Sequence, residues 1–289
     1  MRPTRTPSLR KRISARVRLL RKMYLDRRRH RGARDYAFRW HRSEGPLHVI
    51  SVRHRSNGFR ADLHLRRDTT DLATFEQVFC NHDYNLRRLA RWTDIVATYE
   101  RLSREGSPLI LDLGANVGLA TVQFRSQWPK SFVVSVEPDD ANFAILRRNV
   151  EPLGNTLPVH AAVAATDGFA RIVDPAAAAW AKQTELTAES TGTRAVSVAT
   201  LLEEARKRQP DCQPFLCKVD IEGFEANLFS ANTEWVEQFP LIVIELHDWM
   251  LPGQGKARTF LRAVAEHDRD FVHLGENVFS IRNDRRLAP

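Results

Sequence analysis

The sequence lacks long apolar segments and contains few cysteines. Its most apolar runs, such as residues 109–111 and 241–244, are far shorter than the ~18 to 20 residues of a membrane-spanning helix. We therefore expect no integral membrane protein. The three cysteines, Cys80, Cys212 and Cys217, form no CxxC pair and are too few for a disulfide framework. This usage is typical of a reducing compartment, and we expect a cytoplasmic protein.

Acidic residues are scarce at the start of the chain. Residues 1–45 contain 16 Lys and Arg but only 3 Asp and Glu, a net charge of +13, whereas the remaining 244 residues carry 28 basic and 32 acidic side chains, a net charge of −4. The segment has no apolar h-region, so a secretory signal is not expected. We expect a basic N-terminal arm, disordered or helical, and its first interpretation is a solvated tail. Peripheral contact with an anionic membrane and contact with nucleic-acid phosphates are alternatives, and the acidic body makes a nucleic-acid partner the least expected.

Beyond the arm, the pattern predicts two further parts. Residues 46–106 should form a pre-core unit, with a hairpin from strands 47–53 and 59–65 and then helices over 71–104. Residues 107–289 alternate short apolar strands with helices, which predicts an α/β core with a mainly parallel sheet covered on both faces. Two final strands, 271–274 and 278–281, should close the sheet as an antiparallel hairpin, and residues 174–193 are expected to be a mobile loop.

A glycine turn follows the first strand of the core. Gly114 should let the backbone approach a ligand closely, and Gly118 should let the following helix pack against the sheet. The GxGxxG fingerprint of NAD-binding proteins is missing, because Asn116 takes the middle position. Asp112 would repel a pyrophosphate but can orient a cationic ligand, which favours S-adenosylmethionine (SAM) over NAD. Glu137 ends the next strand, where an acid can accept hydrogen bonds from ribose hydroxyls.

Four motifs in order resemble the FkbM-type SAM-dependent methyltransferase family. They are DLGANVG (112–118), VEP (136–138), KVDIEGFE (218–225) and IELH (244–247). The resemblance implies a class I methyltransferase (Rossmann-like) fold with a seven-stranded sheet, SAM as cofactor, and O-methylation of sugar or polyketide hydroxyls.

The resemblance also implies which residues bind the cofactor. Gly114, Asn116, Gly118 and Glu137 match the family's motifs, and we add three residues in or near the same motifs: Asp112, Val117 and Asp167. The sequence departs from the family in two places. Residues 163–168 read Val-Ala-Ala-Thr-Asp-Gly and have alanine where a serine is often seen, and Asp248 rather than a proline follows His247.

Candidate catalytic residues follow the last two parallel strands. Methyl transfer to a hydroxyl needs a base for its proton, and we expect Asp220, Glu222 and His247 to be the catalytic residues. His247 is the best single base, because an unperturbed histidine has a pKa of ~6.5. A helix cap at Asp220 or Glu222 and a structural histidine are the alternatives. Together with Glu245 these residues could form an oxygen-rich metal site, but no HxH or DxD spacing supports one and no metal is expected.

These observations predict a SAM-dependent methyltransferase that acts on a hydroxyl of a glycan or secondary metabolite. A nucleic-acid methyltransferase guided by the basic arm and a non-catalytic SAM-binding module are alternatives. The first lacks an Asn-Pro-Pro-Tyr-like clamp and a Pro-Cys nucleophile. A non-catalytic SAM-binding module would have no need of acids and a histidine at both strand ends.

Overall fold

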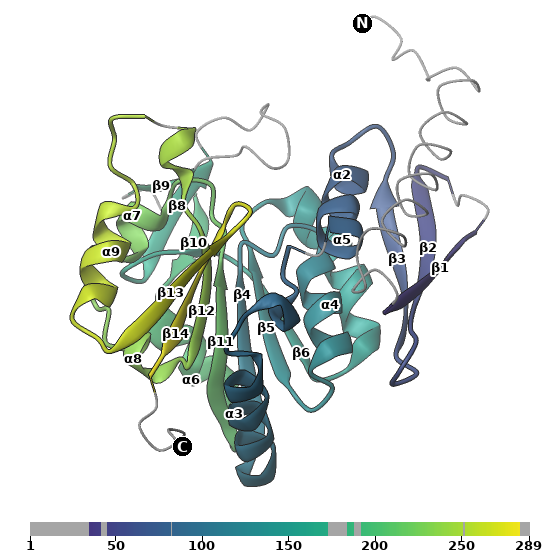
Figure 1. Ribbon diagram of the computed structural model, residues 1–289. Helices are drawn as coiled ribbons and strands as arrows, with labels where there is room; N and C mark the ends of the chain where they lie inside the picture. Colours follow the sequence, from purple (N-terminus) through teal and green to yellow (C-terminus); the bar gives the residue numbers. More distant parts are fainter. Residues whose placement is uncertain are drawn as a thin grey trace, which may run out of the picture.

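The computed structural model describes residues 35–41, 45–81, 83–172, 184–187, 192–250 and 252–283. Within these ranges, the central sheet has seven strands in the order β13-β14-β12-β11-β4-β5-β6 (Figure 1). β14 is antiparallel to both of its neighbours and the other pairs are parallel. The mainly parallel sheet and its closing hairpin are therefore confirmed. The strands are β4 (Ser107–Leu113), β5 (Phe132–Glu137), β6 (Thr156–His160), β11 (Cys212–Val219), β12 (Leu241–Glu245), β13 (Arg269–Leu274) and β14 (Asn277–Arg282).

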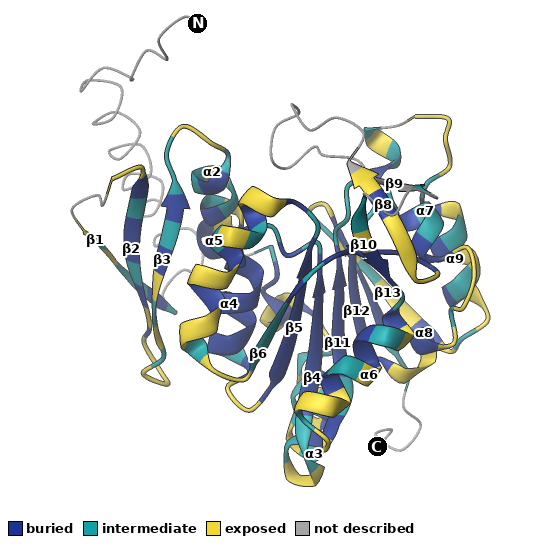
Figure 2. Cartoon of the chain, turned by 180° about the vertical axis from the view of Figure 1, so that it is seen from behind, coloured by how far each residue is buried: buried dark blue, intermediate teal, exposed yellow. Residues whose placement is uncertain are grey.

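Helices cover both faces of this sheet (Figures 1 and 2). Side chains of β4 alternate between two hydrophobic cores, with Ile110 in one and Leu109 and Leu111 in the other. The first core contains α3 (Trp92–Glu105), α4 (Leu119–Gln127) and α5 (Asp140–Val150). The second core contains α6 (Val198–Arg208), α7 (Glu225–Leu228), α8 (Trp235–Gln238) and α9 (Arg258–Ala265). Burial on both faces explains why the central strands are almost wholly apolar.

A second sheet, in the order β1-β2-β3, lies beside α4 and α5 (Figure 1). Its strands are β1 (Tyr36–Trp40), β2 (Leu47–His54) and β3 (Arg60–Arg66). β1 corrects the expected boundary of the basic arm at residue 45. Tyr36 is 2% exposed and its hydroxyl lies 2.5 Å from Ser126 Oγ in α4, so apolar burial outweighs the basic composition there.

Short helices connect this sheet to the core. They are α2 (Asp71–Phe75), the π-helix η2 (Glu76–Asn81) and the 3-10 helix η3 (Leu86–Arg88). Phe75 and Phe79 are fully buried in the same hydrophobic core as Ile110. The pre-core segment and the main sheet thus share one core. Two further 3-10 helices are η4 (Glu151–Leu153) and η5 (His247–Trp249).

A smaller sheet, in the order β7-β10-β8-β9, was not expected. It is formed by β7 (Ala162–Val163), β8 (Gly168–Ile172), β9 (Thr184–Thr187) and β10 (Thr193–Val196). Part of the loop expected at residues 174–193 is therefore strand, and the rest of that loop lies outside the described residues. Among the described helices, none has the length and apolar character needed to cross a membrane.

Candidate functional site

The glycine turn brings the ends of β4 and β11 together. Gly114 has φ +76°, and a Cβ added there would lie 1.8 Å from the backbone oxygen of Asp220. Gly118 has φ +84°, and its Cβ would lie 2.8 Å from Val150 Cγ1 in α5. These contacts add a reason for glycine at Gly114 and correct the expected one at Gly118. Gly114 makes room for the Asp220 backbone, in addition to the close ligand approach expected there, and Gly118 makes room for α5 rather than for the sheet.

Asn116 occupies the middle of the turn with φ +50°. Its backbone N–H donates to Glu137 Oε2 at 2.9 Å. Its side-chain Oδ1 is buried and has no hydrogen-bond partner among the described residues. A buried acceptor without a donor costs ~1 to 3 kcal/mol, so a ligand that donates a hydrogen bond here would stabilise the turn.

Glu137 ends β5 and is 5% exposed. Its Oε1 accepts hydrogen bonds from the Asp139 backbone N–H and from Asn142 Nδ2, both at 3.1 Å. Burial raises the pKa of Glu137 to about 7, although these hydrogen bonds and the one from Asn116 oppose the rise. The carboxylate is therefore held in a fixed position and titrates near neutral pH.

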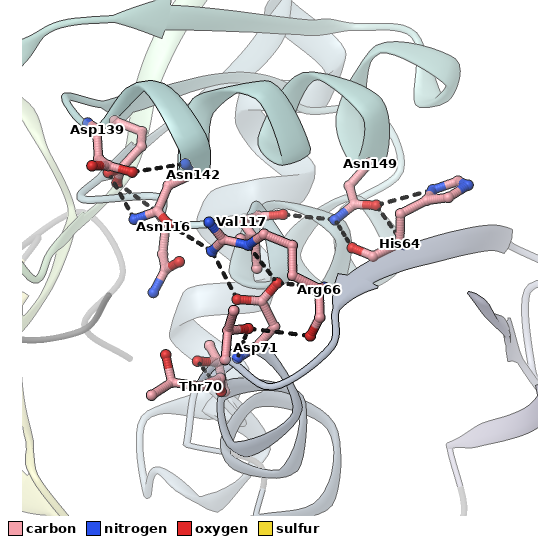
Figure 3. A network of polar contacts seen from close by, with 12 residues as sticks. His64, Arg66, Thr70, Asp71, Asn116, Val117, Asp139, Asn142 and Asn149 are labelled. Carbon is pink, nitrogen blue, oxygen red and sulfur yellow. Dashed lines mark hydrogen bonds and ion pairs between the residues drawn. The ribbon is translucent and has the colours of Figure 1, made fainter. Parts of the chain in front are cut away.

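Asn142, which donates to Glu137, belongs to a polar network that reaches the second sheet (Figure 3). Arg66 Nη2 in β3 donates to Asn142 Oδ1 at 2.7 Å and forms an ion pair with Asp71 at 2.8 Å. Asn149 Nδ2 in α5 donates to the backbone oxygen of Val117 at 2.8 Å. The pre-core segment thus positions both Glu137 and the glycine turn.

A cavity of about 60 Å³ opens between the ends of β4, β5 and β11. Gly114, Asn116 and Glu137 line it, as the sequence predicted. A nucleoside with two ribose hydroxyls and an adjacent amine suits this set, because Glu137 and Asn116 Oδ1 are both acceptors. The other lining residues are Val136, Pro138, Asp139, Ala161, Ala162, Val163, Asp220, Ile221, Glu222 and Phe224. Apolar members such as Ala162 and Phe224 were not predicted. The only sequence signal for them is that they lie shortly after strands β6 and β11.

Four expected cofactor residues, Asp112, Val117, Gly118 and Asp167, do not line this cavity. Asp112 is 0% exposed, accepts a hydrogen bond from Thr121 Oγ1 at 2.7 Å and forms an ion pair with Lys218 Nζ at 3.2 Å. The side chain of Val117 lies in the hydrophobic core. Asp167 accepts hydrogen bonds from Ser197 N and Thr200 Oγ1, both at 2.6 Å, at the start of α6. The contacts of Asp112, Val117 and Asp167 stabilise the fold around the site, and their expected role in cofactor binding stays a prediction.

A second, larger cavity of about 440 Å³ adjoins the first. The two share Gly114, Asn116, Asp220 and Glu222. One wall of the larger cavity comes from the pre-core segment, including the π-helix η2, an element that is frequent at functional sites. Its acidic lining residues are Glu76, Asp83, Asp220, Glu222, Glu245 and Glu276.

His247 lies beneath the junction of the two cavities, 1% exposed. Its Nδ1 is 2.9 Å from Glu225 Oε1, and its Nε2 faces three carboxylates. Burial lowers the pKa of His247, but the hydrogen bond to Glu225 and the negative charges of Asp220 and Glu222 outweigh this and raise it to about 9. His247 lines neither cavity, and its expected role as the base stays a prediction.

The carboxylates near His247 also have raised pKa values. Burial and the charge of Asp220 raise the pKa of Glu222 to about 8 and that of Glu245 to about 7. The expected helix cap by Asp220 or Glu222 is absent from this part of the described chain: α7 begins at Glu225 with no side-chain cap. The Glu225 carboxylate instead accepts from the backbone N–H groups of Ile221 and Gly223 at 3.3 Å. Asp220 and Glu222 are thus free of capping roles.

Two solved methyltransferase structures are similar to the chain at low sequence identity. Among curated protein sequences, none matches the chain. An O-methyltransferase from Bacillus cereus in complex with SAH is 15% identical, with 73% of this chain and 90% of that chain covered and a TM-score of 0.39. A precorrin-6y C5,15-methyltransferase from Geobacter metallireducens GS-15 is 10% identical, with 68% and 90% covered and a TM-score of 0.34.

A family model matches the part of the chain that contains the four sequence motifs. The family model described as the methyltransferase FkbM domain matches residues 112–273, more than half of the chain. The matched range includes the glycine turn, Glu137, and the two strand ends that carry Asp220 and His247. The chain therefore belongs to the FkbM family of methyltransferases.

Proposed function

We propose that the protein transfers the methyl group of SAM to a hydroxyl oxygen of a small glycan or secondary metabolite. The observation that carries this proposal is the junction of the two cavities at Gly114, Asn116, Asp220 and Glu222. A cofactor in the first cavity and an acceptor in the second would meet there. An in-line displacement needs this arrangement, with the attacking oxygen held close to the methyl carbon.

The residues of the first cavity suit SAM, which supplies an electrophilic methyl group on a sulfonium sulfur. Glu137 accepts hydrogen bonds from the ribose hydroxyls, and Asn116 Oδ1 accepts one from the amino group of the methionine part. Ala162, Val163 and Phe224 form an apolar surface for the adenine ring. Asp112 acts indirectly, because it holds Lys218, whose Nζ donates to the Gly114 backbone oxygen at 2.7 Å.

The residues of the second cavity suit a neutral hydroxyl compound. Asp220 and Glu222, at the junction, accept the hydrogen bond that orients the hydroxyl. Glu245 lines only the larger cavity, and its pKa of about 7 lies near working pH, where a general base is most efficient. We therefore propose that Glu245, rather than His247, is the general base that accepts the proton of the acceptor hydroxyl.

Labelled methyl transfer tests this proposal. The full chain is incubated with methyl-labelled SAM and three acceptor pools: hydroxyl-rich oligosaccharides, aliphatic alcohols of the polyketide type, and RNA. We expect label in a hydroxyl compound, identified as a methyl ether by NMR, and a loss of about 10²-fold or more in Glu245→Gln. Label confined to base nitrogens of the RNA would overturn the assignment to hydroxyl acceptors.

A further inference from the structure

His247 is held in one orientation by a buried carboxylate. Glu225 is 0% exposed, and its Oε1 lies 2.9 Å from Nδ1 of His247. This contact fixes the imidazole plane and directs Nε2 toward the cavities. Metal-binding histidines are commonly oriented in this way, with the far ring nitrogen bonded to a carboxylate.

Nε2 of His247 makes no hydrogen bond to any described residue. Its nearest acidic oxygens are Glu222 Oε2 and Glu245 Oε1, both at 3.6 Å, and Asp220 Oδ1 at 3.7 Å. All three distances exceed a hydrogen bond. Nε2 therefore points into a group of three carboxylates, each at an ion-pair rather than a hydrogen-bond distance.

The spacing of these atoms suits a single ion. One ligand atom each from Asp220, Glu222 and His247 can be chosen so that all three lie within 4.8 Å of one another. An octahedral ion with ligands at ~2.1 Å places adjacent ligand atoms ~3 Å apart and opposite ones ~4.2 Å apart. Small side-chain rotations would bring the three ligand atoms to these separations.

The loop that carries Asp220 and Glu222 has an unfavourable backbone conformation at Glu222. Glu222 has φ +55°, a left-handed conformation that is unfavourable for a glutamate, and Gly223 follows with φ +89°. Lys218 lies 3.4 Å from Asp220, but it also pairs with Asp112 at 3.2 Å. Its charge is thus shared, and the carboxylates around His247 still repel one another.

We propose that Asp220, Glu222 and Nε2 of His247 bind one divalent cation at the junction of the two cavities. Two carboxylate oxygens and one imidazole nitrogen suit Mn²⁺ best, with Mg²⁺ and Fe²⁺ as competitors. Asp220 and Glu222 line both cavities, so the remaining positions of the ion face the acceptor.

The role of the cation rests on the proposed function. An acceptor hydroxyl bound to the ion becomes more acidic, and its proton passes to Glu245. The oxygen lone pair then forms the new bond to the methyl carbon. The carbon–sulfur bond breaks, and its electron pair returns to sulfur.

Direct binding measurements test the site without an acceptor. The full chain, stripped with a chelator, is titrated with Mn²⁺ by calorimetry and by EPR of the free ion. We expect one ion per chain, and an affinity at least about tenfold weaker in Glu222→Gln and in His247→Gln. Glu276→Gln is the matched control, because it removes a carboxylate of the same cavity that is not a ligand; it should bind Mn²⁺ like the wild type.

A second binding measurement separates loss of the cation site from unfolding. Affinity for S-adenosylhomocysteine (SAH) should be preserved in His247→Gln, because His247 lines neither cavity, and this shows that weaker Mn²⁺ binding is not caused by unfolding. No Mn²⁺ binding, or equal affinity in wild type, Glu222→Gln and His247→Gln, would overturn the cation site. Methyl transfer to a hydroxyl that persists after chelation would then leave the proposed function standing. Bound Mn²⁺ without any transfer to hydroxyls would instead refute the proposed function and keep the site.

Discussion

The ammonium group of Lys218 in β11 lies 3.2 Å from the carboxylate of Asp112 in the neighbouring strand β4. Their side chains are 3% and 0% exposed. Burial would lower the pKa of Lys218, but the charge of Asp112 keeps it well above its ordinary value. Both strands are parallel and adjacent, so the pair fixes the two strand ends from which Gly114 and Asp220 project.

Removing one member of this pair should be strongly destabilising. Lys218→Met leaves the Asp112 carboxylate buried without its cation, and we expect the free energy of unfolding to fall by about 3 to 5 kcal/mol. The double variant Lys218→Met/Asp112→Asn should recover part of this loss, because no charge is left unpaired. Urea denaturation of the three proteins measures both values. A single variant within about 1 kcal/mol of wild type would show that the pair is not a main support of the strand ends.

Gly114 should tolerate no side chain. In Gly114→Ala the new Cβ would meet the backbone oxygen of Asp220 at 1.8 Å, so the two strand ends must separate. We expect a lower melting temperature and loss of SAH binding. Gly154→Ala is the matched control, since Gly154 also has a positive φ of +62° but no atom within 4 Å of the added Cβ. Similar SAH affinity in both variants would mean that only backbone strain matters at Gly114.

SAH affinity should depend on pH through Glu137. Ribose hydroxyls donate to the ionised carboxylate, so binding favours the deprotonated form and releases a proton. Because the pKa of Glu137 in the free protein is about 7, affinity should be weak below that pH and strong above it. The expected gain between about pH 6 and pH 8 is about tenfold. Calorimetry over this range should show the gain in wild type and not in Glu137→Gln; a parallel slope in both would assign the titration to another group.

The basic arm and β1 should be separable by truncation. Residues 1–34 contain 14 Lys and Arg and one acid, so removing them eliminates the net charge of the arm without touching Tyr36. We expect unchanged SAH affinity but weaker, salt-sensitive sedimentation with anionic vesicles. Removing residues 1–40 also deletes β1 and the buried Tyr36, at about 3 kcal/mol or more of stability. Equal vesicle binding by the full chain and the shorter truncation would exclude the arm as a membrane contact.

Strand and helix types were predictable where a single pattern dominated. The sequence pattern predicts a helix over 140–150, and α5 has these bounds because Asp139 caps it and accepts from Asn142 N at 2.9 Å. The pattern also predicts a helix over 117–127, but α4 starts at Leu119, since Gly118 in a left-handed conformation must precede the helix. β1 was missed because Arg39 and its basic surroundings masked a short run of aromatic residues.

The site was predictable in its position but not in its contacts. Motif order along the chain correctly brought Glu137 and Gly114 to one cavity. Burial of Asp112 and His247 depends on partners that are distant in sequence, Lys218 and Glu225, and no local pattern indicates such pairs. The pre-core wall of the larger cavity depends on tertiary packing in the same way.

The central claim is that the smaller cavity binds SAM and the larger one the acceptor. Calorimetric titration of SAH into wild type, Glu137→Ala and Glu245→Gln tests it most directly, with NAD as the competing ligand. Loss of the ribose acceptor in Glu137→Ala should weaken SAH binding about tenfold or more, Glu245→Gln should stay within about threefold of wild type, and NAD should not bind. Undiminished SAH affinity in Glu137→Ala, or a larger loss in Glu245→Gln, would contradict the assignment of the two cavities.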